Sequence, residues 1–455
     1  MNSMIIKNGN IVTAEKIFKS DIEIRNGKIF SIGQDLNKKD VQIIDVDEML
    51  ILPGIIDSHV HFEEIFPGGL KNADDFESGT RAAAAGGVTT VIDFTSPQAR
   101  GESLVKAFQR RRRQADPEVF VDYSLHCCFP GRVTSELLSE MREIKDIGAP
   151  SFKIFTAGEN LGLNRGEVFA VLQQAAELGL MVDVHAEEGD VINFLENRLL
   201  KAGKNSLSFF PQSRPNFVEE TVVHDLIRFN ALLKGKLYFV HLSAGESVET
   251  LNLAQDLEGK VFGETCPQYL LLTDSCYEFD NGEQYAIVPP LRHAEDQKRL
   301  WQAIKEGIIQ VVGTDHCPFM SQDKRGKSDF TLVPKGMGSV ELLLPLMFSE
   351  GVVKKRISVN RLVRVLSTDP AKIFGMFPRK GAIALNSDAD LVIFNPGEKW
   401  QVSTNKLVSR ADFSPYDSFE LTGKVEMTIS RGEVVYRDGK ILGKAGRGQF
   451  IFRKL

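Results

Sequence analysis

Two histidines, His59 and His61, stand two residues apart at the end of an apolar run, and Asp57 precedes His59 by the same spacing. In an extended strand the side chains at positions i and i+2 point to the same face, so these three side chains project together. Imidazole nitrogens and carboxylate oxygens are the ligands that borderline divalent ions such as Zn²⁺ prefer. This spacing therefore predicts a metal site where the strand ends.

Further nitrogen and oxygen donors stand at or near the ends of other short apolar runs: Lys153, His185, His241 and Asp315. A single histidine at a strand end is more often an ordinary hydrogen-bonding residue than a metal ligand. A single aspartate there can simply cap the following helix. If all of these residues had such ordinary roles, their shared position at strand ends would be several independent coincidences. The joint pattern therefore favours a metal centre, with one position open for water if the centre is catalytic.

Lys153 lies among apolar neighbours in the run SFKIF. A buried ammonium group is costly, so burial should lower the pKa of this side chain. Its head could instead reach solvent or pair with a local acid, and the sequence leaves these interpretations open. A neutral amine can add carbon dioxide to become a carbamate, whose two oxygens could bridge two metal ions.

These donors are placed by a regular alternation of strand and helix patterns. Helical patterns such as GEVFAVLQQAAELGL separate most of the strands, and several end in glycine, as helices commonly do. Such alternation is typical of parallel βα units, and eight units predict an α/β fold of the TIM-like (β/α)8 barrel type, whose strand ends meet at one rim. The eight predicted strands are residues 54–61, 88–95, 121–129, 151–155, 181–187, 236–243, 261–266 and 309–316.

The two ends of the chain have a different pattern. Residues 4–52 and roughly 383–455 contain short alternating strands broken by NG, RG and DG turns, without helical spacing. We therefore predict one small β-sandwich domain made from both termini, residues 1–52 plus 383–455, and a (β/α)8 barrel over residues 53–382.

The composition is that of an ordinary globular protein, since 42% of the 455 residues are hydrophobic and 25% are charged. A net charge of -6 argues against nucleic acid or a membrane surface as a partner, because both require a basic field. The sequence shows no basic and apolar leader and no apolar stretch long enough to cross a bilayer. The five cysteines form neither a CxxC pair nor a dense framework, so we expect reduced thiols in a cytoplasmic protein.

Longer motifs in the chain resemble those of the hydantoinase and dihydropyrimidinase branch of the cyclic amidohydrolases. They are PGIIDSHVHF, ADDFESGTRAAAAGGVTTVIDF, FKIF, VHAEE, HLS, ETCPQYLLLT, PPLR, GTDHCPF and FPRKGAIALNSDADLVIFNP. The resemblance covers nearly the whole chain, including both parts of the predicted sandwich. It implies a homotetrameric cytosolic enzyme with a two-metal centre, usually zinc, that hydrolyses a small cyclic amide.

The resemblance divides the predicted ligands between two divalent metal ions. Lys153, as a carboxylated lysine, would bridge the two ions. A bridging hydroxide would attack the amide carbonyl carbon, and Asp315 would take its proton and pass it to the leaving ring nitrogen. The product would be a ring-opened carbamoyl amino acid. The implied ligands are His59, His61 and Asp315 for the first ion, and His185 and His241 for the second.

Three positions depart from the pattern of that branch. Hydantoinases have a tyrosine five residues after the bridging lysine, which polarises the ring carbonyl and stabilises the oxyanion, but Gly158 stands there. Such donors are worth about 10²–10³ in rate, so either another residue replaces it or the reaction differs. Val288 replaces the serine before PPLR, and Lys335 replaces the asparagine of PNG. The resemblance implies that both positions bind substrate through main-chain groups, while the Lys335 side chain is either an exposed loop charge or favours an anionic substrate.

Three alternative functions follow from related proteins. Allantoinases share the metal ligands and lack the tyrosine, so Gly158 makes allantoinase the main alternative. A dihydroorotase would need an arginine two residues after the HxH pair, where this chain has Glu63. The collapsin-response proteins are non-catalytic scaffolds that have lost metal ligands, whereas this chain keeps all six.

Overall fold

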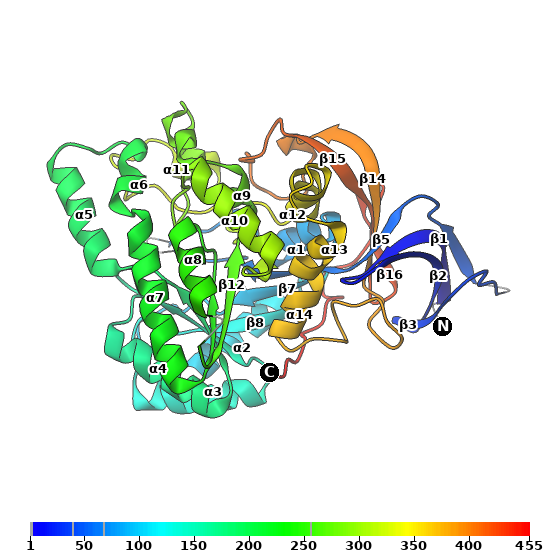
Figure 1. Ribbon diagram of the computed structural model, residues 1–455, viewed down its shortest axis with the longest axis horizontal. Coiled ribbons are helices and arrows are strands. Elements are labelled where there is room, and N and C mark those ends of the chain that lie inside the picture. The colour runs from blue at the N-terminus through cyan, green and yellow to red at the C-terminus, as the bar shows by residue number, and fades with distance from the viewer. Residues whose placement is uncertain (1–2, 39–40, 67–68, 255–256) are drawn as a thin grey trace.

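Eight parallel strands form a sheet that follows the chain order and curves into a barrel, on the left of Figure 1. The computed structural model describes residues 3–38, 41–66, 69–254 and 257–455. All eight predicted strands are present. They are β6 (Ile55–Val60), β7 (Val88–Phe94), β8 (Asp122–Cys128), β9 (Ser151–Phe155), β10 (Met181–His185), β11 (Lys236–Phe239), β12 (Lys260–Thr265) and β13 (Val311–Val312).

The barrel closes at its C-terminal rim although its last strand is short. Only Val311–Val312 of the predicted run is regular strand, and three residues further on Asp315 adopts a left-handed backbone, with φ 53°, that an extended strand does not have. A parallel bridge between Val60 and His316 joins the first strand to the chain that follows the last one. The His61 amide also donates to the His316 carbonyl at 2.9 Å. The first and last predicted ligand segments are therefore neighbours.

Helices cover the outside of the barrel between the strands (Figure 1). Their ends follow ordinary capping rules: α4 begins after Asn164, whose side chain accepts from the Glu167 amide, and ends at Gly179 with φ 68°. The connection from β10 to β11 contains α5, α6 and α7, which brings additional chain next to the rim. The helices are α1 (Phe76–Ala85), α2 (Leu104–Ala115), α3 (Ser135–Asp146), α4 (Arg165–Leu178), α5 (Gly189–Lys201), α6 (Phe210–Ser213), α7 (Asn216–Leu233), α8 (Gly245–Leu253), α9 (Pro267–Leu271), α10 (Ala294–Glu306), α11 (Ser321–Lys324), α12 (Leu343–Leu346), α13 (Val359–Val363) and α14 (Asp369–Ile373).

A second sheet, on the right of Figure 1, is made from both ends of the chain. Its two parts meet where β14 pairs antiparallel with β5, with Leu391 opposite Pro53. This arrangement confirms the predicted α/β class, a (β/α)8 barrel with a small β domain from both termini. The strands, in spatial order, are β17 (Lys440–Ile441), β16 (Glu433–Arg437), β15 (Glu420–Ser430), β14 (Leu391–Gln401), β5 (Leu50–Pro53), β1 (Ser3–Val12), β2 (Ile17–Arg25) and β3 (Lys28–Gly33), with β4 (Gln42–Asp45) beside β1.

The predicted limits of the two domains, 1–52 plus 383–455 and 53–382, stay predictions. Residues 1–2 and 39–40 of the first range, and 67–68 and 255–256 of the second, lie outside the described residues. One part of the first range, the segment 449–453, lies against the barrel. Phe450 bridges Tyr123 of β8, and the buried Arg453 donates to Ser124 Oγ at 2.7 Å and to Ser151 Oγ at 2.8 Å. Because these serines lie toward the beginnings of β8 and β9, the segment covers the end of the barrel opposite the rim.

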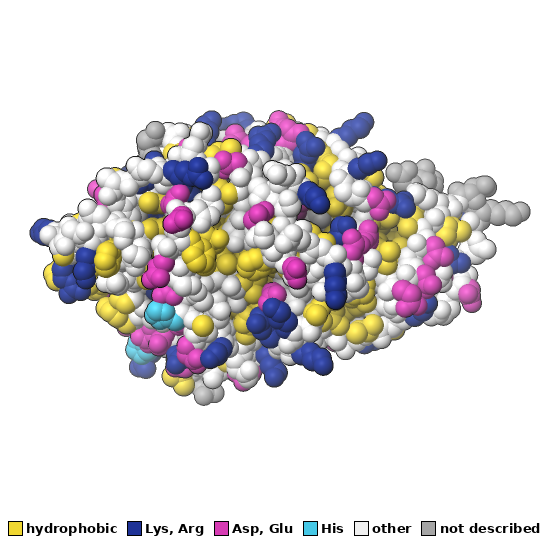
Figure 2. All heavy atoms as spheres, turned by 90° about the horizontal axis from the view of Figure 1, so that it is seen from above, with side chains coloured by type: hydrophobic (Ala, Val, Ile, Leu, Met, Phe, Trp, Pro, Cys, Tyr) yellow, Lys and Arg dark blue, Asp and Glu magenta, His cyan; other side chains and the backbone are white. Residues whose placement is uncertain are grey.

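One face of the molecule shows charges of both signs. Seen from above the view of Figure 1, lysine and arginine side chains lie beside acidic ones, with apolar side chains between them (Figure 2). Such a face, on a chain with net charge -6, lacks the uniformly basic field that would attract nucleic acid. Within the described part of the chain, we find no helix whose length and apolar character would let it span a bilayer.

A buried cluster of charges joins the barrel to the chain that leads into the second sheet. The Lys380 amine lies 2.6 Å from Asp122 Oδ2, 2.5 Å from Asp390 Oδ2 and 3.0 Å from Asp388 Oδ2. Burial alone would lower the pKa of this lysine, but the three carboxylates outweigh burial and raise it. Asp122 also pairs with Arg431, and Asp388 with Arg379 and Lys28, whereas Lys380 is the cation found beside Asp390 among the described residues.

We expect Lys380→Met to destabilise the fold by about 3–5 kcal/mol, because Asp390 would stay buried without its cation and Asp122 and Asp388 would each lose one of theirs. The free energy of unfolding, measured by urea titration, tests this. Arg379→Met is the matched control: Arg379 also pairs with Asp388, at 2.9 Å, but its side chain is 43% exposed. Such a pair is worth about 0–1 kcal/mol. Equal losses in the two variants would contradict the role given to Lys380.

Candidate metal centre

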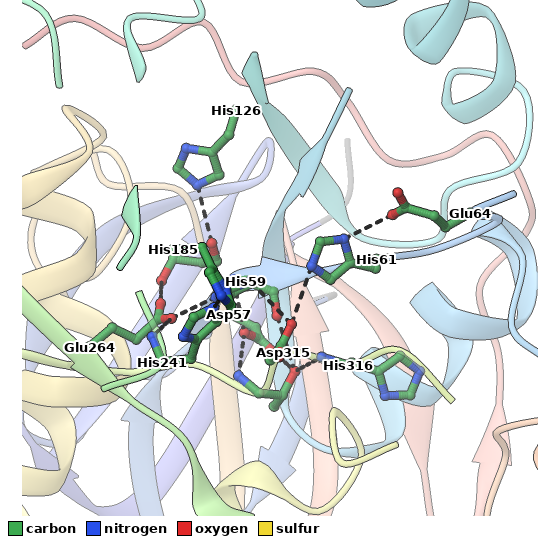
Figure 3. A network of polar contacts seen from close by, with 12 residues as sticks. Asp57, His59, His61, Glu64, His126, His185, His241, Glu264, Asp315 and His316 are labelled. Atoms are coloured by element: carbon green, nitrogen blue, oxygen red, sulfur yellow. Dashed lines mark hydrogen bonds and ion pairs between the residues drawn. The ribbon is translucent and has the colours of Figure 1, made fainter. Parts of the chain in front are cut away.

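The six side chains predicted as metal ligands meet at the C-terminal rim of the barrel, and five of them are labelled in Figure 3. The ring of His59 lies 5.3 Å from that of His61 and 5.4 Å from that of His241. The His241 ring lies 4.8 Å from that of His185. The four imidazoles thus form one continuous group, drawn from strands β6 and β10 and from the residues that follow β6 and β11.

His59, His61 and Asp315 present the first set of ligand atoms. Nε2 of each histidine lies 3.2 Å from Asp315 Oδ1, and the three side chains offer ligand atoms within 4.8 Å of one another. His59 Nε2 is buried and finds no hydrogen-bond partner among the described residues. A buried nitrogen without a partner, facing a carboxylate, fits a divalent cation.

His185 and His241 present the second set. His185 Nδ1 lies 3.0 Å from His241 Nε2, so each ring turns one nitrogen toward the other. Burial lowers the pKa of both imidazoles, which keeps them neutral. The neutral imidazole is the form that binds a metal ion.

Carboxylates hold the outer nitrogens of three of these histidines, and Figure 3 shows two of them, Glu64 and Glu264. A histidine whose outer nitrogen is bonded in this way keeps its proton there and turns its other nitrogen inward, as metal-binding histidines do. The donor set therefore has both the ligand types and the orientation of a metal centre. The pairs are His59 Nδ1 with Glu264 Oε1 at 2.6 Å, His61 Nδ1 with Glu64 Oε2 at 2.9 Å, and His185 Nε2 with Glu187 Oε2 at 2.7 Å.

These three carboxylates are not among the site residues predicted from the sequence. Glu64 and Glu187 stand three and two residues after the histidines that they hold, and this spacing was the available signal. Glu264 is 205 residues from His59, and only the fold brings the two together. Burial opposes ionisation of Glu187, but the Arg214 charge and the bond to His185 outweigh it and lower its pKa to about 2. The carboxylate therefore stays charged.

Asp57 is buried on the same strand as His59 but is not grouped with the predicted metal ligands His59, His61 and Asp315. Its carboxylate accepts from the Thr314 hydroxyl at 2.6 Å, from the Thr314 amide at 3.1 Å and from the His59 amide at 3.2 Å. Asp57 thus ties the first ligand strand to the chain just before Asp315. His241 and Asp315 both have positive φ, 41° and 53°, which is uncommon outside glycine and is tolerated where surrounding contacts fix the backbone.

Residues 50–435 match the sequence profile of the amidohydrolase family. The chain belongs to this family. It is 39% identical to a D-hydantoinase from Geobacillus stearothermophilus, covering 99% of this chain and 96% of that protein, and 36% identical to a D-phenylhydantoinase from Escherichia coli, covering 99% and 98%. The crystal structure of a dihydropyrimidinase from Brevibacillus agri superposes with a TM-score of 0.96 at 37% identity, covering 99% and 98%. These findings confirm the predicted resemblance: this amidohydrolase is a hydrolase of the hydantoinase branch.

Lys153 of this amidohydrolase is buried at the metal centre. Its amine lies 5.1 Å from the centre of the Phe94 ring and 5.0 Å from that of the Phe155 ring, and the residue is 1% exposed. The interpretation in which its head reaches solvent is therefore wrong. Burial lowers the pKa of the amine, although Asp315 and Asp183 oppose the shift. A larger neutral fraction makes the amine a better nucleophile toward carbon dioxide.

Gly158 lies in the loop after β9 with φ 104°, and a Cβ placed there would meet no atom within 4 Å. It lines a cavity of about 700 Å³ between this loop, α4, α5 and α7. The space beside the position of the missing tyrosine is therefore open. None of the six predicted ligands is among the residues that line this cavity.

Val288 and Lys335, the two predicted substrate-binding positions, lie on neighbouring segments. The Gly336 amide donates to the Ala286 carbonyl at 2.9 Å, which places the two segments side by side. The Lys335 amine donates to the carbonyls of Phe330 at 2.6 Å and Val333 at 2.5 Å, so its charge is used within its own loop. Burial and the nearby Arg214 lower its pKa to about 7. The interpretation as an exposed loop charge is therefore wrong, while a preference for an anionic substrate stays a prediction.

Zinc should stabilise this amidohydrolase, because ions that bind only the folded chain shift the unfolding equilibrium. At a free zinc concentration 1,000 times the Kd, the gain is about 4 kcal/mol per site. We expect chelator treatment to lower the Tm in calorimetry and added zinc to restore it. His59→Ala should diminish this zinc effect, whereas His224→Ala, at a side chain 57% exposed, should preserve it. A full zinc effect in His59→Ala would contradict the assignment.

Proposed function

We propose that this amidohydrolase opens cyclic amide rings of the hydantoin or dihydropyrimidine type at a two-metal centre. The observation that carries this proposal is the inward orientation of the imidazoles: Nε2 of His59 and of His61 face Asp315, while His185 Nδ1 faces His241. Identities of 36–39% to hydantoinases over 99% of the chain support the ring chemistry.

The donor set suits two zinc ions, because zinc takes imidazole and carboxylate ligands readily. Lys153 would join the two sites as a carbamate, for which its buried amine with a lowered pKa is suited. Each remaining ligand would serve one ion. His59, His61 and Asp315 would hold the first ion, and His185 and His241 the second.

Bound zinc ions would lower the pKa of a water molecule and polarise the amide carbonyl. Asp315 would accept the proton of the attacking water, since its carboxylate stands between the rings of His59 and His61. One water is consumed: its oxygen bonds to the carbonyl carbon, the ring C–N bond breaks, and Asp315 returns the proton to the leaving nitrogen. The product is a ring-opened carbamoyl amino acid.

The side of the ring away from Asp315 would be held by main-chain groups near Val288 and Lys335, whose segments are joined through Gly336 and Ala286. Main-chain groups can form hydrogen bonds with the amide edges of a ring, and these bonds do not depend on the side chains at positions 288 and 335. The Lys335 amine stays with its own loop. An anionic group on the substrate is therefore no part of this proposal.

Allantoin is a second candidate substrate, favoured by one observation. Gly158 provides no hydroxyl where hydantoinases have a tyrosine, and the space beside it is open. Dihydroorotate is disfavoured because Glu63 occupies the position of the arginine that would bind its carboxylate. A non-catalytic scaffold of the collapsin-response type is disfavoured because all six metal ligands are present.

The resemblance also suggests a homotetramer in the cytoplasm. All five cysteines are free and buried, which suits a reducing compartment. Light scattering of the purified protein would measure the particle mass, and a monomer would contradict the tetramer.

A ring-opening screen tests the proposed function. With zinc and bicarbonate supplied, hydantoins or dihydrouracil should be opened faster than allantoin and dihydroorotate, as measured by the release of carbamoyl products. We expect Asp315→Asn to retain most of the metal and to lose about 10²- to 10⁴-fold in turnover, because the proton carrier is removed. Near-normal turnover in that variant would rule out this role, and preferred opening of allantoin would favour the second candidate.

The bridge formed by Lys153 is tested by Lys153→Ala, which should lose metal because two shared ligand oxygens disappear. Short carboxylic acids such as propionate should restore part of the metal content and activity by occupying the same place. Metal per chain, measured by mass spectrometry, is the readout. Lys236→Ala is the control, because Lys236 begins β11 at the opposite end of the barrel. Full metal content in Lys153→Ala without an added acid would exclude the bridge.

A further inference from the structure

Glu187 connects the metal centre to a cation that the proposed reaction does not use. Its Oε2 lies 2.7 Å from His185 Nε2 and accepts from Arg214 Nη1 at 2.5 Å. The Glu187 side chain is fully buried, and its backbone amide donates to Thr156 Oγ1 at 2.9 Å. A carboxylate buried this deeply requires a cation nearby, and Arg214 supplies it. The His185 ring is thus held by a charged pair.

Arg214 lies between α6 and α7, and several contacts fix its position. Its amide donates to the Pro211 carbonyl at 3.2 Å, and its own carbonyl accepts from the Arg292 guanidinium. Its Nη2 lies 3.6 Å from Glu196 Oε1 on α5, and its side chain is 14% exposed. The guanidinium therefore keeps one position relative to Glu187.

The other two carboxylates that hold histidines have different supports. Glu264 accepts from the Tyr238 hydroxyl at 2.9 Å and from the Ser58 hydroxyl at 3.1 Å. Glu64 has a side chain that is 20% exposed and can be solvated by water. Loss of Arg214 should therefore disturb the orientation of His185 and leave His59 and His61 in place.

We propose that Arg214 is a positioning residue for the second metal site. By holding Glu187 against His185 Nε2, it fixes the ring with Nδ1 turned toward His241 and so sets the affinity of the second ion relative to the first. This inference rests on the two-metal centre proposed above. It gives the chain between β10 and β11 a role in metal binding, although none of that chain contains a predicted ligand.

A zinc titration of the full-length protein tests this inference. Wild type and variants are dialysed against zinc buffers of graded free concentration, and zinc per chain is measured by mass spectrometry. Wild type should bind two ions. In Arg214→Met one of the two binding steps should weaken by about 10- to 100-fold, while the other stays unchanged. Glu64→Gln should weaken the opposite step.

Arg165→Met is the matched control, because Arg165 pairs with Asp225 at 2.5 Å but its side chain is 66% exposed and lies away from the ligands. It should titrate like wild type. Unchanged binding in Arg214→Met, or equal weakening of both steps, would overturn the role of Arg214. If circular dichroism shows that Arg214→Met does not fold, the same titration is done on Arg214→Lys and Glu187→Gln. One weakened binding step in either variant supports the proposal. Two unchanged binding steps in both variants overturn it. A wild-type chain with fewer than two sites would instead overturn the two-metal centre, and the role of Arg214 with it.

Discussion

A histidine ring can direct one nitrogen to a metal ion only while the proton on its other nitrogen is held in place. In this protein carboxylates meet that condition for three of the four predicted ligand rings, those of His59, His61 and His185. Each buried carboxylate needs its own partners, because an ionised group without them is costly inside a protein. Tyr238 and Ser58 serve Glu264, and Arg214 serves Glu187. The rim therefore depends on layers of polar contacts beneath and beside it.

The barrel turns ligands from distant parts of the chain into neighbours by ending its parallel strands at one rim. Closure between Val60 and His316 is the decisive contact, since it brings the first ligand strand against the segment that carries Asp315. Asp57 reinforces the same junction through Thr314. Asp315, with its positive φ, lies three residues after the end of the last strand and belongs to the same arrangement. The chain that carries this predicted ligand is therefore held by these contacts rather than by regular strand structure.

Much of this arrangement could be predicted from the sequence because it is written in local patterns. The period-two spacing of His59 and His61 and the alternation of strands with helices depend only on neighbouring residues. Glu264 behind His59 could not be predicted in this way, because the pair forms only after the barrel closes. The same limit explains Lys335, whose amine turns back to carbonyls that no residue pattern locates. Contacts that form only when the chain folds back on itself could not be predicted from local sequence patterns.

The docking of Arg453 beneath the barrel has a consequence for the order of assembly. Ser124 and Ser151 belong to β8 and β9, yet the guanidinium that bonds to both emerges from the ribosome about 300 residues after them. During synthesis all eight barrel strands are made before the segment 449–453 that covers this end of the barrel. Until Arg453 docks, Ser124 and Ser151 lack the guanidinium that bonds to both of them, so this end of the barrel is completed by a late part of the chain.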